Sequence, residues 1–279
     1  MIISIASGKG GTGKTTVATN LAYTLNKDVQ ILDCDVEEPN VHLFLTPEID
    51  VSTPVLSVVP AVDENLCSLC GACSEICNFS AINKVGDTVL VFPELCHSCR
   101  GCFLVCPEQA IHESTREIGT LETGSKNGIE FVHGKLRVGE AMSPPLIKRV
   151  RKETNPDKVT IIDAPPGTSC PVMTAMKDTD FVLMVTEPTP FGLHDLKLAV
   201  DAVNTLGIPK GLVINRSDIG DDGVKKFAEE RNIPILMEIP FDRSIAEKYS
   251  KGVLLVEDSQ EWREGFMALY EKITSLVEE

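Results

Sequence analysis

The chain of 279 residues has no surplus of positive charge and no long apolar run. Its 26 lysines and arginines are outnumbered by 41 aspartates and glutamates, and its formal net charge is −15. This balance argues against nonspecific binding to nucleic acid or anionic lipid through a basic face. No run of about 18 apolar residues occurs, so no transmembrane helix is predicted. We expect neither nucleic acid nor a membrane as a partner.

A glycine-rich motif begins at residue 8, which leaves no room for a signal peptide, so we expect a cytoplasmic protein. Hydrophobic content of 43% and charged content of 24% are typical of soluble globular proteins. Ten cysteines are many for a reducing compartment, where structural disulfides are rare. Eight of them lie within residues 67–106, and this clustering favours metal binding over disulfides.

The glycine-rich motif, GKGGTGKT at residues 8–15, fits the phosphate-loop pattern G-x-x-x-x-G-K-S/T. An apolar run precedes it, and Val17, Leu21 and Leu25 follow at helical spacing, which predicts strand, loop and helix. Such a loop turns backbone N–H groups toward a polyphosphate, while Lys14 reaches the β- and γ-phosphates and Thr15 binds Mg²⁺. The alternative, a glycine-rich surface turn, is disfavoured by this context. The expected contacts to ATP or ADP are Gly8, Gly10, Gly11, Thr12, Gly13, Lys14, Thr15 and Thr16.

Further apolar strands are predicted at residues 29–33, 159–163, 181–188 and 210–217, alternating with helical stretches. This alternation predicts an α/β fold with a doubly wound, mostly parallel sheet. Asp35, Asp163 and Asn215 each follow a strand. Because ligands bind at the carboxyl ends of such strands, we expect these three side chains to meet in one crevice beside the phosphate loop.

An internal repeat occupies the middle of the chain, where residues 67–82 and 96–111 superpose at an offset of 29 residues. Each copy contains C-x₂-C-x₂-C-x₃-C, the spacing of bacterial ferredoxins, in which the fourth cysteine ligates the cluster of the other copy. Two zinc sites are the alternative, although zinc modules usually separate two C-x₂-C pairs more widely. The predicted [4Fe–4S] ligands are Cys67, Cys70, Cys73 and Cys106 for one cluster, and Cys96, Cys99, Cys102 and Cys77 for the other.

Residues 61–112 thus resemble two-cluster ferredoxins, except that Asn78 stands where those proteins usually have proline. The surrounding chain, residues 1–60 and about 141–279, resembles the MinD/Mrp-type ATPases with a deviant phosphate loop. That family includes cell-division positioning, plasmid-partition, cluster-carrier and nitrogenase iron-protein ATPases. We therefore expect a discontinuous ATPase domain (1–60 and 141–279) and an inserted α+β ferredoxin-type domain (61–112). Residues 113–140, rich in Gly and Thr, are expected to form a return linker with short strands.

The family resemblance implies roles for several residues. The extra lysine, Lys9, matches the one that crosses a homodimer to the partner's nucleotide in this family, as an arginine finger supplied in trans does. Asp35 matches the residue that positions the attacking water, and Asp33 lies where the outer shell of the metal is expected. Asp163 and Gly167 match the second switch, near Mg²⁺ and the γ-phosphate. Asn215 matches the adenine contact, and residues 239–242 match the segment that closes the base pocket.

Three further features of the sequence bear on membrane binding and on cluster binding. The C-terminal amphipathic stretch has an acidic polar face, so we expect it to dock on the protein rather than on lipid. Cluster carriers of the family use a C-terminal C-x₂-C pair, which this chain lacks. Cys170 lies seven residues after Asp163, the spacing of a cluster ligand in the nitrogenase iron protein. No upstream partner cysteine occurs, so Cys170 is predicted to be a buried hydrophobe.

Three functions remain open. The first is an ATPase whose nucleotide-switched homodimer gates electron transfer or cluster assembly through two [4Fe–4S] clusters, with slow, partner-stimulated hydrolysis to ADP and phosphate. The second is a carrier that passes clusters to apo-proteins. The third is spatial organisation with a structural ferredoxin, which the negative net charge disfavours. The implied partner is a redox protein or a cluster acceptor.

Overall fold

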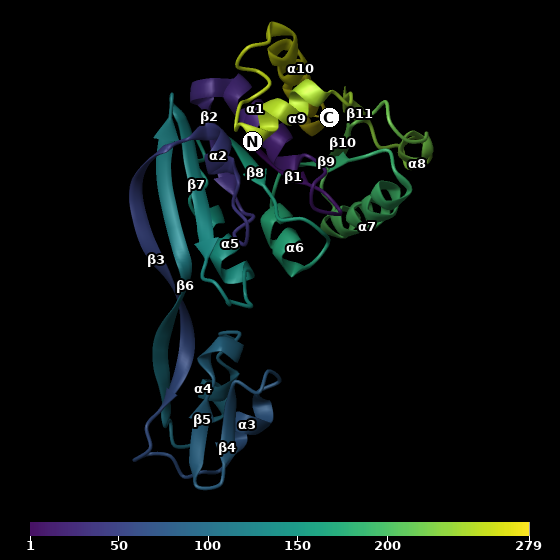
Figure 1. Cartoon of the computed structure of the whole chain (residues 1–279). Helices are drawn as coiled ribbons and strands as arrows, with labels where there is room; N and C mark the ends of the chain where they lie inside the picture. The colour runs from purple at the N-terminus through teal and green to yellow at the C-terminus, as the bar shows by residue number, and fades with distance from the viewer. Residues whose placement is uncertain (279) are drawn as a thin grey trace.

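A nine-stranded sheet forms the centre of the molecule, in the order β11-β10-β9-β1-β8-β2-β7-β6-β3 (Figure 1). In this computed structural model, which describes residues 1–278, the seven strands from β11 to β7 are parallel. The expected doubly wound, mostly parallel α/β sheet is confirmed. Its strands are β1 (Ile2–Ala6), β2 (Val29–Asp33), β3 (Glu48–Val62), β6 (Ile111–Lys126), β7 (Ile129–Leu136), β8 (Val159–Asp163), β9 (Phe181–Thr186), β10 (Lys210–Asn215) and β11 (Ile235–Ile239).

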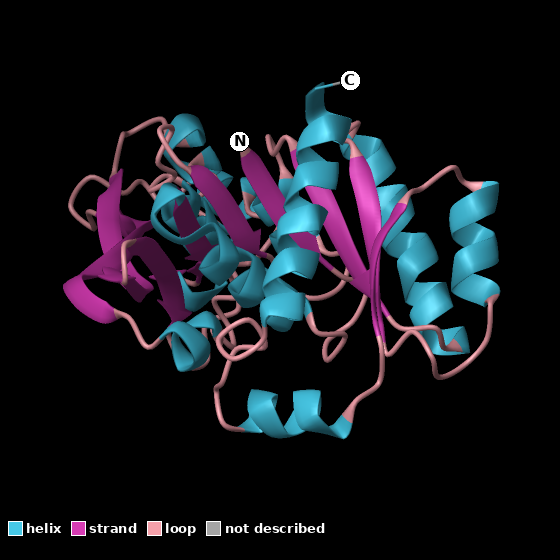
Figure 2. Ribbon diagram, turned by 90° about the horizontal axis from the view of Figure 1, so that it is seen from above, coloured by secondary structure: helices cyan, strands magenta, loops and turns pink. Residues whose placement is uncertain are grey.

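Helices cover both faces of the sheet (Figure 2). One core holds apolar side chains of α5 (Pro144–Arg151), α6 (Cys170–Met176), α7 (Pro190–Leu206) and α8 (Gly223–Glu230). The other holds those of α1 (Lys14–Leu25), α2 (Val41–Leu45) and α10 (Gln260–Glu278), with α9 (Arg243–Ser250) at its margin. A short 3-10 turn (Asn26–Asp28) connects α1 to β2. Successive strand residues serve opposite cores: Ile161 belongs to the second and Ile162 to the first. This two-sided burial explains the continuous apolar runs of the parallel strands.

Two long strands carry the chain out of the sheet. β3 and β6 pair antiparallel along their whole length, but only residues 119–126 of β6 also pair with β7. Beyond that point the two strands continue as a ribbon to a separate lobe, called the arm here (residues 63–110; Figure 1). The arm contains α3 (Ala72–Ile76), β4 (Ile82–Val85), β5 (Thr88–Val91), a 3-10 turn (Pro93–Leu95) and α4 (Gly101–Val105). Its small core is built around Cys73, Ile82, Cys102 and Ile111.

Residues 113–140, expected to be a return linker with short strands, supply most of β6 and all of β7 in the main sheet. Their glycines suggested flexibility, but they permit close packing between strands. A Cβ on Gly119 would lie 2.3 Å from the carbonyl oxygen of Lys135, and one on Gly124 would lie 2.0 Å from that of Glu48. Glycine in a strand often marks such close backbone approach. The sheet therefore includes residues that the prediction placed outside the ATPase domain.

The C-terminal helix α10 packs on the sheet as expected. Its buried residues Phe266, Leu269 and Ile273 join the core that also holds α1. Across residues 1–278, no helix combines the length and apolarity needed to cross a membrane.

Candidate functional site

The phosphate loop connects β1 to α1, as its motif predicts. Gly11 (φ 79°) and Gly13 (φ 99°) adopt left-handed backbone conformations that favour glycine. Gly8 faces a different constraint, because a Cβ there would lie 2.2 Å from the carbonyl oxygen of Asp195. α1 begins at Lys14, whose side chain is largely buried beside the loop. The loop therefore presents a helix N-terminus and a lysine to an anion.

Thr15 and Asp163 meet at one end of the loop. The Thr15 hydroxyl donates to Asp163 Oδ2 at 2.6 Å, and Asp163 Oδ1 is buried without a partner. Burial raises the pKa of Asp163 to about 6, although Lys14 and the Thr15 hydrogen bond oppose this shift. Mg²⁺ prefers oxygen ligands and usually retains several waters. The unpaired carboxylate oxygen and the neighbouring hydroxyl therefore fit a magnesium ion and its water shell.

The two acids after β2 occupy different environments. Asp35 lines the cavity, and its pKa is raised to about 6 by burial and by the charge of Asp163. Asp33 is fully buried and accepts hydrogen bonds from the backbone N–H groups of Asp35, Asn40 and Val41. Its pKa is raised by burial and by Asp163. Asp33 thus holds residues 35–41 in place.

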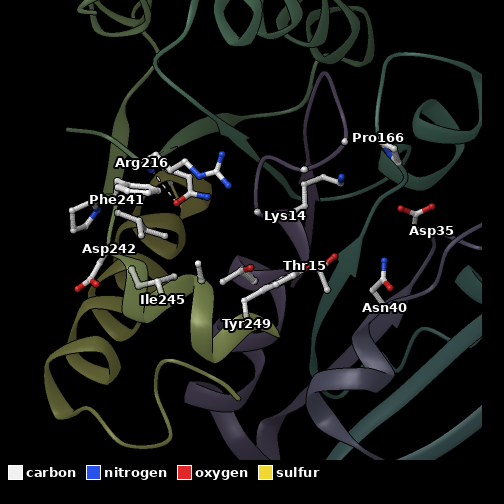
Figure 3. A pocket seen from close by; sticks show the side chains of 18 of the residues that line it. Lys14, Thr15, Asp35, Asn40, Pro166, Arg216, Phe241, Asp242, Ile245 and Tyr249 are labelled. Atoms are coloured by element: carbon white, nitrogen blue, oxygen red, sulfur yellow. Dashed lines mark hydrogen bonds between the residues drawn. The ribbon is translucent and has the colours of Figure 1, made fainter. Parts of the chain in front are cut away.

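A cavity of about 320 Å³ extends from the phosphate loop toward an apolar end (Figure 3). Figure 3 shows Lys14 and Thr15 in its centre, with Asp35, Asn40 and Pro166 on one side and Arg216, Phe241, Ile245 and Tyr249 on the other. The predicted contact Asn215 lines this cavity, and its side-chain amide donates to the Thr12 carbonyl at 2.9 Å. A polar phosphate end and an apolar end suit a nucleotide.

The predicted nucleotide-site residues do not all line the cavity. Gly10, Gly11, Gly13, Lys14, Thr15, Thr16, Asp35 and Asn215 do. The cavity is not lined by Gly8, Thr12, Asp163 or Gly167. The Gly167 amide donates to the Ser7 carbonyl. Lys9 points elsewhere, since its Nζ lies 3.4 Å from Glu187 Oε2.

The arm brings the cysteines together in two sets of four. One cavity is lined by Cys67, Cys70, Cys73 and Cys106, and a second by Cys77, Cys96, Cys99 and Cys102. Three thiols of each set come from one motif, and the fourth is the last cysteine of the other motif. The cysteines are grouped as the ferredoxin spacing groups them.

The two halves of the arm also repeat in backbone conformation. Residues in left-handed conformations recur at the offset of the repeat, as in the pairs Leu69/Ser98, Gly71/Arg100 and Ser80/Gln109. The amides of Ala81 and Ala110 each donate to the last thiol of their own motif, Cys77 or Cys106, at 3.2 Å. Burial would raise the pKa of Cys77, but backbone N–H groups outweigh it and lower that pKa. These donors stabilise a thiolate, which is the form that binds metal.

The donor sets fit clusters better than single ions. Within the described residues 1–278, no three His, Cys, Asp or Glu side chains are close enough together to bind one metal ion. A tetrahedral zinc site needs its thiolates at about 2.3 Å from one point. Four cysteines around one cavity are the number that ligates a [4Fe–4S] cluster. Cys34 is buried, whereas Cys170 is exposed, so the predicted burial of Cys170 is wrong.

Several residues of the site were missed by sequence reasoning. Glu187 follows β9 and pairs with both Lys9 and Arg216, the latter at 2.7 Å. Its position at the carboxyl end of a parallel strand was the available signal. Tyr249 reaches the cavity from α9, a helix with no motif to identify it.

Comparisons with known proteins agree with this geometry. The family described as the CobQ/CobB/MinD/ParA nucleotide-binding domain matches residues 3–256. An uncharacterized protein of Methanocaldococcus jannaschii is 33% identical over 264 residues, which are 90% of either chain. An iron–sulfur cluster carrier protein of Methanococcus maripaludis is 28% identical and covers 97% of this chain and 84% of its own.

Among solved structures, the septum site-determining protein MinD of Pyrococcus horikoshii, in complex with Mg-ADP, is similar to this chain with a TM-score of 0.62. The two chains are 21% identical, and the match covers 99% of this chain and 96% of MinD. This similarity supports the fold. Because the family match spans most of the sequence, the chain belongs to the CobQ/CobB/MinD/ParA family of nucleotide-binding domains.

Proposed function

We propose that this protein is an ATP-hydrolysing carrier of iron–sulfur clusters, which holds two [4Fe–4S] clusters on its arm and passes them to acceptor proteins under nucleotide control. The observation that carries the proposal is the crossed lining of the two arm cavities, with four cysteines around each. Relatives named iron–sulfur cluster carrier proteins, 28% identical in two archaea, support it. On this proposal residues 61–112 form a ferredoxin-type unit.

The nucleotide site supplies the switch in this proposal. Lys14 holds the β- and γ-phosphates, while Thr15 and Asp163 hold Mg²⁺ and its waters. Asp35 orients the attacking water, and Lys9 of a second copy reaches the phosphates when ATP joins two chains. Lys9 lies against Glu187 in the single chain. Hydrolysis then depends on the second copy.

A second candidate function is electron transfer gated by the same nucleotide switch. The observation that favours it is the completeness of each thiol set, together with the burial of Cys73 and Cys102 in the core of the arm. A resident cofactor suits such enclosed ligands, since a carrier must release its cargo. This chain also lacks the C-terminal C-x₂-C pair of the carriers considered above.

One experiment distinguishes the two candidates. The protein is loaded anaerobically with ⁵⁵Fe and sulfide and then mixed with an apo-ferredoxin, with ATP, with ADP or without nucleotide. The carrier proposal predicts that ⁵⁵Fe appears on the acceptor at a rate that depends on the nucleotide. Retention of ⁵⁵Fe in every state, with reversible reduction and oxidation, supports gated electron transfer instead. Stoichiometric zinc without iron–sulfur absorption contradicts both.

A further inference from the structure

The two arm cavities differ in their relation to the body. β3 begins in the body at Glu48 and reaches the arm at Val62. The cavity of Cys77, Cys96, Cys99 and Cys102 is lined by Val58 and Pro60, whereas the other is lined by Val62 and by Ile111 of β6. We call the first the proximal cavity and the second the distal cavity. The proximal cavity is lined by ribbon residues on the body side of Val62, whereas the distal cavity is lined only by the last ribbon residues, Val62 and Ile111.

A hydroxyl pair joins the ribbon to the proximal cavity. Ser57 Oγ lies 2.7 Å from Ser98 Oγ, which also donates to the Val58 carbonyl at 2.6 Å. Ser98 stands between Cys96 and Cys99, and its amide donates to Cys96 Sγ at 3.4 Å. The repeat places Leu69 at the equivalent position of the first motif, with the same left-handed backbone but no hydroxyl. The connection is therefore specific to the proximal cavity.

A buried ion pair joins the same level of the ribbon to the body. Arg116 lies directly opposite Ser57 in the β3–β6 register. Its guanidinium donates two hydrogen bonds to the Glu140 carboxylate, and the one from Nη2 to Oε1 measures 2.9 Å. The side chains are only 10% and 1% exposed. The Glu140 hydrogen bond raises the pKa of Arg116, and the charge of Glu94 acts in the same direction.

The loop that carries Glu140 is bonded to the segment that lines the nucleotide cavity. Glu140 follows β7, whose last residue, Leu136, donates its amide to the Val36 carbonyl at 2.8 Å. Val36 is the neighbour of Asp35, which lines the nucleotide cavity. The Arg137 amide donates to the Ile118 carbonyl of β6, and the Glu140 amide donates to the Arg137 carbonyl. A displacement of residues 35 and 36 therefore reaches the loop of Glu140 through hydrogen bonds.

We propose that Arg116 and Glu140 are positioning residues that link the nucleotide state to the proximal cavity and leave the distal cavity unaffected. A shift of Glu140 displaces Arg116. Because Arg116 pairs with Ser57 across the ribbon, the displacement reaches the hydroxyl contact between Ser57 and Ser98, beside Cys96. Because loss of one partner would leave a buried charge unpaired, the pair favours discrete arrangements over gradual deformation. This inference rests on the proposed nucleotide control of the clusters.

The test is a redox titration of both clusters with ADP and with a non-hydrolysable ATP analogue, followed by electron paramagnetic resonance. Cys77→Ala and Cys106→Ala identify the two signals. In the unaltered protein we expect the proximal midpoint potential to differ between the two nucleotides, and the distal one to stay constant. By reciprocity, a tenfold difference in nucleotide affinity between oxidation states corresponds to about 59 mV for one electron.

Glu140→Gln and Arg116→Gln should abolish the proximal shift while nucleotide still binds, and Arg116→Lys should restore part of it. Arg149→Gln, which removes an arginine from an exposed pair with Glu153, is the matched control and should keep the full shift. If a single substitution prevents folding, the double variant Arg116→Gln/Glu140→Gln leaves no buried charge unpaired. Amide exchange at residues 94–100 provides a second readout: it should respond to nucleotide in the cluster-free chain and lose this response in the double variant.

Two results overturn the inference. One is a wild-type shift that survives in Glu140→Gln and in the double variant. The other is the absence of any nucleotide-dependent shift and of any nucleotide-dependent exchange in the unaltered protein. Iron content and nucleotide-dependent transfer to apo-ferredoxin, measured on the same samples, report separately on the proposed function. Loss of those properties counts against the function itself, whereas their presence without the shift counts against Arg116 and Glu140 alone.

Discussion

Replacing Glu187 should strengthen the ATP-dependent association of two chains. Lys9, which the proposed mechanism sends to the partner's nucleotide, lies against Glu187 within its own chain. Lys9 must leave this carboxylate before it can reach across a dimer. Glu187→Gln keeps the shape of the side chain and removes the charge that retains Lys9. The substitution therefore lowers the cost of releasing the lysine.

The magnitude follows from the geometry of the pair. At an effective dielectric constant of about 20, two charges 3.4 Å apart attract by about 5 kcal/mol before desolvation is counted. Glu187 is mostly buried and also pairs with Arg216, so the cost of desolvating the charges offsets much of this attraction. Lys9 is 31% exposed, and the measured net values for solvent-exposed ion pairs reach about 1 kcal/mol. A symmetric dimer releases two such lysines, so about 2 kcal/mol, or a factor of about 30, should appear in the dissociation constant.

Analytical ultracentrifugation with a non-hydrolysable ATP analogue measures this dissociation constant. Glu230→Gln removes one negative charge from an exposed position on α8 and controls for reduced repulsion between two acidic chains. The double variant Glu187→Gln/Lys9→Ala should lose the gain, because no lysine remains to be released. Binding of nucleotide to the single chain is measured separately, since Arg216 lines the cavity. If Glu187→Gln chains associate no more tightly than Glu230→Gln chains, the reasoning is refuted.

Three further predictions concern the two sites. Cys77→Ala should lower iron from about eight to about four per chain by loss of the proximal cluster, and Cys106→Ala should lose the distal one instead; loss of the same spectroscopic signal in both variants contradicts the crossed ligation. Lys14→Ala should weaken nucleotide binding itself, whereas Lys9→Ala should retain binding and lose hydrolysis, as checked by equilibrium binding and phosphate release. Because burial raises the pKa values of Asp35 and Asp163 to about 6, both become protonated as the pH falls below 6, and hydrolysis should fall with them. A phosphate-release rate that is constant between pH 7 and pH 5 contradicts this assignment.

The parts of the fold that local pattern determines were predictable from the sequence. A phosphate loop requires glycine where the backbone is left-handed, and Gly11 and Gly13 meet this requirement. The parallel strands are buried on both faces, so their apolar runs are continuous and easily recognised. The crossed grouping of the cysteines followed from spacing, because three ligands within seven residues leave the fourth to come from elsewhere. In each case a short segment contains the physical constraint.

The parts that depend on partners distant in the sequence were not predictable. The glycines of β6 suggested a linker, since the carbonyl groups they approach belong to neighbouring strands, Glu48 in β3 and Lys135 in β7. Lys9 and Glu187 are 178 residues apart, and nothing near either residue indicates the other. The same holds for Ser57 and Ser98, whose contact depends on the course of the ribbon.

The two cysteine motifs of the arm are alike, and only the attachment of the arm to the ribbon makes their two cavities different. Both motifs have the same spacing and the same sequence of left-handed residues, so in isolation they would bind equivalent groups. The ribbon breaks this equivalence because it passes Ser98 and not Leu69. β3 follows α2, whose first amide is bonded to Asp33, and β6 is bonded to β7, whose last amide is bonded to Val36. Both strands of the ribbon are therefore anchored to the segment that lines the nucleotide cavity. A movement of that segment acts on two strands at once, and the proximal cavity is the first part of the arm that it reaches.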